Sequence, residues 1–134
     1  MLGGIFLQKV LYEDEKTTIG NLKNLVKTFC EDRDWDQYHN PKDLAIGIIT
    51  ESSELLELFR FKSDKEVIDI FANENKKQEV MNELADVLYF ILRFAEKYQI
   101  DLSSEFHKKM SENNKKYPIE KCKGLSRKYD KLIV

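Results

Sequence analysis

The chain has 134 residues, enough for one domain with a buried core. Its net charge of −2, with 42% hydrophobic and 34% charged residues, gives no general case for binding nucleic acid or a membrane surface. No apolar run approaches the roughly 20 residues of a membrane span, and the opening residues lack the pattern of a signal peptide. We therefore expect a single cytoplasmic domain over residues 1–134, in which Cys30 and Cys122 are free thiols rather than a disulfide.

The first predicted element is an arm followed by a helix. Five Gly and two Pro leave little punctuation, which favours long helices over many short strands. Residues 1–18 have no firm helical period, and we expect an N-terminal arm, either extended or a short helix. Apolar residues with i, i+3, i+4 and i+7 spacing then predict a helix over residues 19–34. A polar loop over residues 34–40 follows it.

The second predicted helix begins at a clear start signal. Asn40 suits the N-cap, Pro41 suits the first helical position, and Asp43 places an acidic side chain in the first turn. We expect this helix to run from Pro41 to about Phe61.

The third helical stretch opens with a capping box formed by Ser63 and Glu66. We expect it to pause near residues 73–75 and to resume as a long helix over residues 76–98.

The last predicted helix is capped by Asp101 or Ser103 and ends near Tyr117, because Pro118 cannot continue it. Residues 119–134 are expected to form a basic tail. Because the strand signal is weak everywhere, the predicted fold class is all-α, a bundle of about four main helices.

Two acidic pairs carry the chemistry, Glu51 with Glu54 and Glu83 with Asp86. At about 100° per residue, each pair shares a helical stripe with apolar residues and with no Lys or Arg. Ionised carboxylates on apolar faces are costly unless something neutralises them. Brought together from two helices, the four would form an all-oxygen site suited to a hard cation such as Mg²⁺. From the residues alone, a structural ion-pair network is as good an interpretation of the two acidic pairs as a metal site.

Other metal sites are disfavoured. Di-iron bundles use Glu-x-x-His on two helices, but Ser104 stands three residues before His107, and His39 lies in a loop. Zinc would need a Cys/His cluster. Mg²⁺, or Mn²⁺ in its place, is usually held by a few carboxylates together with substrate phosphates, which points to phosphate chemistry. The chain has no Gly-rich GKS or GKT loop, so it is not a P-loop enzyme.

The loop aromatic Trp35 has two interpretations. It can anchor the loop against the bundle, which the residues alone favour, or it can stack on a nucleobase. His39 in the same loop is more often solvated than a ligand.

The chain resembles the all-α NTP pyrophosphohydrolases, the MazG-like superfamily, over about residues 20–130. Within it, the chain is most similar to members that hydrolyse dCTP. The resembling segments are Arg33–Pro41, Glu51–Lys62, Glu83–Leu88, and Lys109-Met110 with Asn113 and Tyr117-Pro118.

The resemblance implies hydrolysis of dCTP or a related pyrimidine deoxynucleotide to its monophosphate and pyrophosphate, in a homotetramer or dimer. From the net charge and the lack of a long apolar run, we expect no nucleic-acid or membrane partner. It implies that the catalytic residues, which also bind Mg²⁺, are Glu51, Glu54, Glu83 and Asp86. The substrate-binding residues that it implies are Trp35, His39, Phe61, Lys109, Asn113 and Tyr117.

Two departures from the family pattern concern the base. Val26 stands where the dCTP-hydrolysing members have a His, and Phe90 replaces a Tyr, although Tyr89 is adjacent. Both put a strict dCTP preference in doubt and leave the metal ligands intact. The alternative function is non-enzymatic: a helical oligomer that binds a nucleotide or a protein, with a structural acidic cluster.

Overall fold

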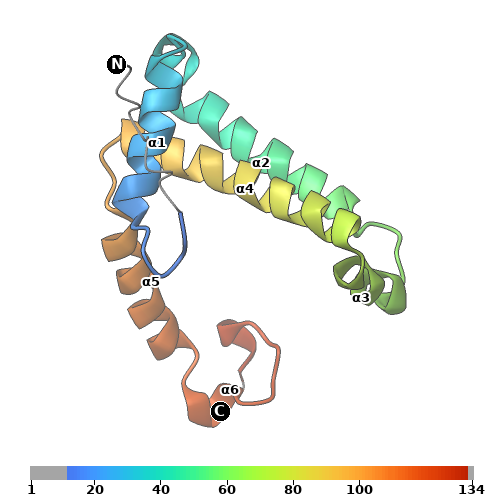
Figure 1. Ribbon diagram of the computed structural model, residues 1–134. Helices are drawn as coiled ribbons and strands as arrows, with labels where there is room; N and C mark the ends of the chain where they lie inside the picture. The colour runs from blue at the N-terminus through green and yellow to red at the C-terminus, as the bar shows by residue number, and fades with distance from the viewer. Residues whose placement is uncertain (1–11, 133–134) are drawn as a thin grey trace. The chain divides into compact units, whose positions relative to one another are not determined.

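The computed structural model describes residues 12–132, and within that range the chain contains helices and loops without a strand (Figure 1). The all-α prediction is confirmed. The chain divides into two compact units, Met1–Tyr98 and Gln99–Val134. Part of the predicted N-terminal arm, residues 1–11, lies outside the described residues, and residues 12–18 are a loop with a turn at residues 14–16.

Helix α1 covers Ile19–Glu31. It begins where the sequence predicts because Thr18 and Asn21 form a reciprocal capping box. The predicted end at residue 34 is wrong. Asp34 has a left-handed backbone with φ of 53°, which turns the chain away from the helix axis. A single 3₁₀ turn, Asp36–Tyr38, completes the loop.

Helix α2 covers Pro41–Glu57. Its predicted start is confirmed, since the backbone N–H of Asp43 donates to Asn40 Oδ1 at 2.9 Å. The predicted end at Phe61 is too late. The helix gives way to turns after Glu57, and Phe61 itself is left-handed with φ of 60°.

Helices α3, Asp64–Ala72, and α4, Glu74–Lys97, are separated at Asn73. The capping box of Ser63 and the pause before the long helix are both confirmed. Asn73 is the N-cap of α4 and accepts from the N–H of Lys76 at 3.0 Å, so α4 begins slightly earlier than predicted.

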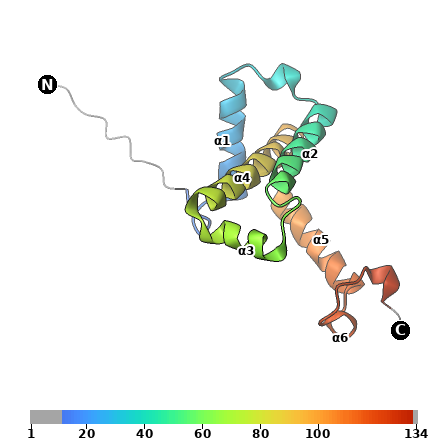
Figure 2. The same ribbon diagram turned by 90° about the vertical axis from the view of Figure 1, so that its right-hand side faces the viewer.

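The first unit is organised around α4. Helix α2 runs antiparallel beside it in both views (Figures 1 and 2), and α1 and α3 also pack on it. Gly47 permits the close approach of α2, because a Cβ atom there would lie 2.4 Å from the ring of Phe90. The buried apolar side chains are Val26, Cys30, Leu44, Ile70, Val80, Leu92 and Ala95.

The second unit contains α5, Leu102–Lys116, and the short α6, Ile119–Cys122. Asp101 caps α5, accepting from the N–H of Ser104 at 2.9 Å. The predicted basic tail contains α6 and a 3₁₀ turn at Tyr129–Lys131. Both cysteines of the chain are free. Across residues 12–132, no helix combines the length and apolar character that a membrane span requires.

Candidate functional site

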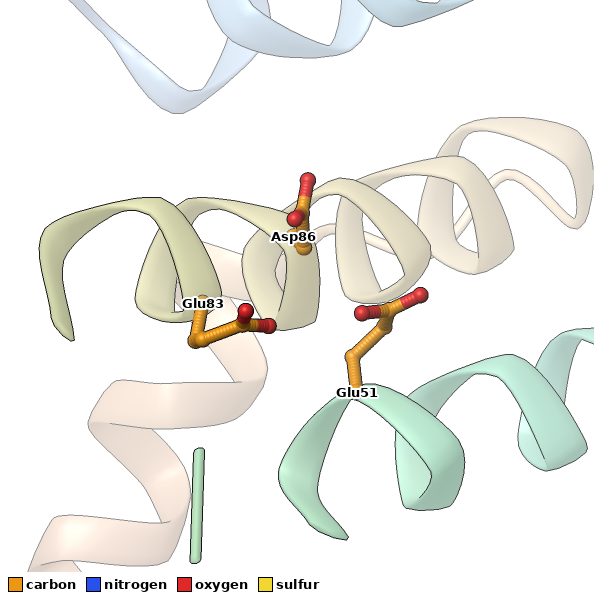
Figure 3. Close-up of side chains that lie close together, drawn as sticks. All are labelled: Glu51, Glu83 and Asp86. Atoms are coloured by element: carbon orange, nitrogen blue, oxygen red, sulfur yellow. The ribbon is translucent and has the colours of Figure 1, made fainter. Parts of the chain in front are cut away.

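Three carboxylates from two neighbouring helices lie together in the first unit. Glu51 projects from α2 toward α4, which carries Glu83 and Asp86 (Figure 3). One carboxylate oxygen from each residue lies within 4.8 Å of the others. The spacing of Glu83 and Asp86 puts them on one face of α4, and the packing of α2 brings Glu51 to that face.

Glu54, one turn further along α2, interacts with this cluster. Burial is the main reason why the pKa of Glu51 is raised, and the carboxylates of Glu54, Asp86 and Glu83 raise it further. The pKa of Glu83 is also raised, first by burial and then by the charges of Glu54 and Asp86. Concentrated negative charge in a partly desolvated place therefore favours protonation of both groups.

The carboxylates of Glu51, Glu83 and Asp86, with Glu54 beside them, fit a divalent cation. Glu83 Oε2 is buried and has no hydrogen-bond partner among residues 12–132. The ion pairs formed within the same range involve none of the four. An all-oxygen ligand set is what Mg²⁺ and Mn²⁺ prefer. A cation held there would satisfy the unpaired oxygen and offset the mutual repulsion of the carboxylates.

A hollow of about 400 Å³ opens beside the cluster. Glu51, Glu54 and Asp86 form its acidic wall. The rest of its lining is aromatic: Phe29, Trp35, Tyr89 and Phe90. An acidic wall facing aromatic rings suits a ligand that has an anionic, metal-binding end and a flat ring. A hollow of about 440 Å³ beside Tyr12 and Lys16 has no acidic lining residue and offers no comparable ligands.

The loop that carries Trp35 is fastened to α4 by a buried arginine that the sequence analysis did not identify. Arg93 is only 1% exposed and donates to the carboxylate of Asp36, to His39 Nδ1 at 2.9 Å and to Glu96 Oε2. Lys97 adds a hydrogen bond to the carbonyl of Asp36. The sequence did carry a signal for a buried, paired charge at this position, because Arg93 is the one charged residue in the apolar run from Val87 to Ala95.

The structure places two predicted substrate residues of the first unit outside the lining of the hollow. His39 is half-buried, faces Arg93, and packs edge-on to Trp35 with ring centroids 6.4 Å apart. Phe61 is 90% exposed after α2, and the guanidinium of Arg60 lies 4.5 Å from the centre of its ring. Of the aromatic candidates in the first unit, Trp35 is the one that shares the hollow with the carboxylates.

The remaining predicted substrate residues belong to the second unit, on or just after α5. Lys109 is exposed and pairs with Glu112 at 3.4 Å. Asn113 is half-buried, and its carbonyl accepts from the N–H of Tyr117 at 2.8 Å. Tyr117 also meets Tyr129 edge-to-face, with ring centroids 6.0 Å apart. Their roles toward a substrate stay predictions.

Known proteins resemble this chain over most of its length. A model of the MazG-like family matches residues 46–132. The proteins called dCTP pyrophosphatase 1 in Rattus norvegicus and Homo sapiens are each 32% identical to it over 115 residues, covering 86% of this chain and 68% of theirs. A pyrophosphatase from Archaeoglobus fulgidus, known from a crystal structure, superposes with a TM-score of 0.70 at 33% identity, covering 82% of this chain and 99% of its own.

Proposed function

The chain belongs to the MazG-like family and is a nucleoside triphosphate pyrophosphohydrolase, and we propose that it hydrolyses dCTP or a related pyrimidine deoxynucleotide with Mg²⁺ as cofactor. The observation that carries the proposal is the hollow in which carboxylates of α2 and α4 face Trp35. We place the reaction in the cytoplasm, where the free thiols of Cys30 and Cys122 would stay reduced.

The carboxylates divide into two roles. Glu51, Glu83 and Asp86, whose oxygens lie within 4.8 Å of one another, would hold the cation. When bound, the cation would neutralise phosphate charge and acidify a water molecule. Glu54 lines the hollow but lies outside that trio. We therefore assign to Glu54 the role of the base that accepts the proton of the attacking water. The water oxygen bonds to the α-phosphorus, the bond from that phosphorus to the bridging oxygen breaks, and pyrophosphate leaves.

The base would be held by the aromatic side of the hollow. Trp35 offers a ring face next to the carboxylates. Val26 is buried and, with Leu25, Phe29 and Tyr89, lines an adjoining apolar hollow of about 330 Å³. An apolar Val26 donates no hydrogen bond to a base edge. We therefore expect looser discrimination among dCTP, dTTP and dUTP than a polar side chain there would give.

We also propose that the enzyme is a homodimer or homotetramer. Helices α2 and α4 each expose a stripe of large apolar side chains at helical spacing: Ile46, Ile49 and Leu56 on α2, and Met81, Leu84 and Leu88 on α4. Apolar stripes of this kind on adjacent helices are typical of surfaces that pack against another subunit. Light scattering coupled to gel filtration would measure the assembly.

Product analysis tests the reaction. The purified protein should release pyrophosphate from a pyrimidine dNTP with Mg²⁺ and lose that activity in EDTA. Glu54→Gln should abolish turnover while keeping the helical fold. Glu57→Gln, on the same helix but paired with Arg60 and outside the hollow, is the matched control and should stay active. Release of nucleoside diphosphate and single phosphate would refute the assigned reaction.

A further inference from the structure

We propose that Arg93 is a positioning residue for nucleotide binding: it fastens the loop that carries Trp35 to the helix that carries Glu83 and Asp86. The proposal rests on the function proposed above. The physical basis is the buried guanidinium of Arg93, which binds the loop to α4. Arg93 itself does not line the hollow.

The contacts cross from one element to the other. Arg93 and Lys97 belong to α4, whereas Asp36 and His39 belong to the loop after α1. The guanidinium reaches Asp36 and His39 from different nitrogens, so it restrains both ends of the 3₁₀ turn. Lys97 holds the backbone of the same turn through the carbonyl of Asp36. Trp35 immediately precedes this restrained turn.

The same contacts fix the state of the imidazole. The Nε–H of Arg93 can only donate, so His39 Nδ1 must accept, and the proton of the neutral ring sits on Nε2. Burial and the charges of Arg93 and Lys97 lower the pKa of His39, against the opposing charges of Asp36 and Asp43. The loop therefore presents a neutral imidazole with a defined donor edge, packed edge-on to Trp35.

Helix α4 thereby sets the spacing between the two sides of the hollow. Asp86 and Arg93 are separated by two turns of one helix, and such a pair shares a face. One rigid helix, α4, therefore fixes the positions of both the carboxylates and the loop that carries Trp35. A small displacement of a binding group is enough to weaken substrate positioning strongly.

A purely structural role is the competing explanation, and stability alone would not exclude it. A buried ion pair is often replaceable by apolar residues of similar volume without loss of stability. The distinguishing readouts are therefore the environment of Trp35, the tautomer of His39, and the ratio of changes in KM and kcat.

The experiment compares Arg93→Met and Arg93→Lys with Glu96→Gln. The Glu96 variant disturbs the partner of Arg93 within α4 and leaves both loop contacts in place. Trp35 is the single tryptophan, so its emission and acrylamide quenching report the loop directly. Nitrogen NMR of the two histidines reports the tautomer of His39, with His107 of the second unit as the internal reference.

Arg93→Met should shift Trp35 emission to the red, increase its quenching, and remove the single Nε2–H tautomer of His39. It should also raise KM for the nucleotide at least several-fold with a smaller change in kcat. Arg93→Lys should give intermediate values, and Glu96→Gln should match the wild type. Should Arg93→Met fail to fold, Asp36→Asn, at an exposed loop position, should give the same changes in weaker form.

Wild-type emission, tautomer and KM in a folded Arg93→Met would overturn the proposal. Equal changes in Glu96→Gln would do the same, because they would assign the effect to the charge balance of α4. The fluorescence and NMR measurements need no turnover. A failure of the proposed enzyme function would therefore appear separately, as a wild-type protein that binds and hydrolyses no nucleotide.

Discussion

Ionisation of Glu51 and Glu83 limits the stability of the protein when no cation is bound. The pKa values of Glu51 and Glu83 are raised, first by burial, so the folded protein binds their protons more tightly than the unfolded chain does. Their contribution to stability is fully present below the unfolded pKa and is lost as the pH rises through the folded pKa. In EDTA, the free energy of unfolding should fall across that window.

Glu51→Gln should therefore raise the Tm of the metal-free protein at neutral pH. The variant removes one of the crowded charges, and it should also gain less from added Mg²⁺ because one ligand is lost. Thermal melts in EDTA and in Mg²⁺ measure both effects. The control Glu57→Gln removes an exposed charge paired with Arg60 and should leave the Tm in EDTA unchanged or slightly lower. A lower Tm for Glu51→Gln in EDTA would contradict the repulsive cluster.

The position of Trp35 is compatible with both roles that the sequence left open, anchoring the loop and stacking on a base. Its ring packs edge-on against Phe29, with ring centroids 5.5 Å apart, and this contact anchors the loop. The same ring also lines the hollow beside the carboxylates. Trp35→Ala should raise KM by an amount equivalent to about 1–3 kcal/mol of lost stacking, and should lower the Tm as well. Trp35→Phe should restore most of both. If Trp35→Ala lowers the Tm alone, at unchanged KM, the anchor is its only role.

At the scale of elements, the distance between α2 and α4 depends on Gly47. A Cβ atom there would lie 2.4 Å from the ring of Phe90, which itself lines the hollow. Gly47→Ala should destabilise the protein, because overpacking typically costs about 1–3 kcal/mol and exceeds the gain of about 1 kcal/mol from better helix propensity. Chemical denaturation measures the difference.

Gly20→Ala is the matched control for this contact. Its Cβ would lie 3.6 Å from Thr18 Oγ1, an ordinary contact, so the substitution in α1 should be neutral or stabilising. In a Phe90→Ala background, Gly47→Ala should destabilise the protein less than it does in the wild type, because the clashing ring is absent. Equal effects of the two glycine substitutions would show that helix propensity, and not the α2–α4 contact, governs Gly47.

Local signals predicted the starts of the helices and the ends of α4 and α5, but they placed the ends of α1 and α2 too late. The caps at Asn40 and Ser63 act through atoms within three residues, so the sequence displays them directly. After α1 and α2 the chain passes through short turns that contain left-handed residues, Asp34 and Phe61, and neither position carries a glycine signal. The bond between Arg93 and His39 joins residues far apart in the chain, and no local pattern specifies it.

At the scale of the whole molecule, the acidic pairs and Trp35 were identifiable because each has a chemical signature. Their convergence on one hollow required the packing of α1, α2 and α4. The same packing leaves large apolar side chains exposed in the first unit: Ile49 is 67% exposed and Leu84 is 52% exposed. Burying such side chains in a subunit interface removes apolar area from water at about 25 cal/mol per Å².

A charge on this surface should break the assembly. Leu84→Glu should lower the molar mass measured by light scattering to that of a smaller species, because an unpaired buried carboxylate is costly at an apolar interface. Asn75→Glu adds the same charge to the first turn of α4, at an exposed polar position on the opposite side of the helix from Leu84, and should leave the assembly intact. A wild-type protein that is monomeric at micromolar concentration would refute the oligomer outright. An unchanged mass for Leu84→Glu would move the interface to another face.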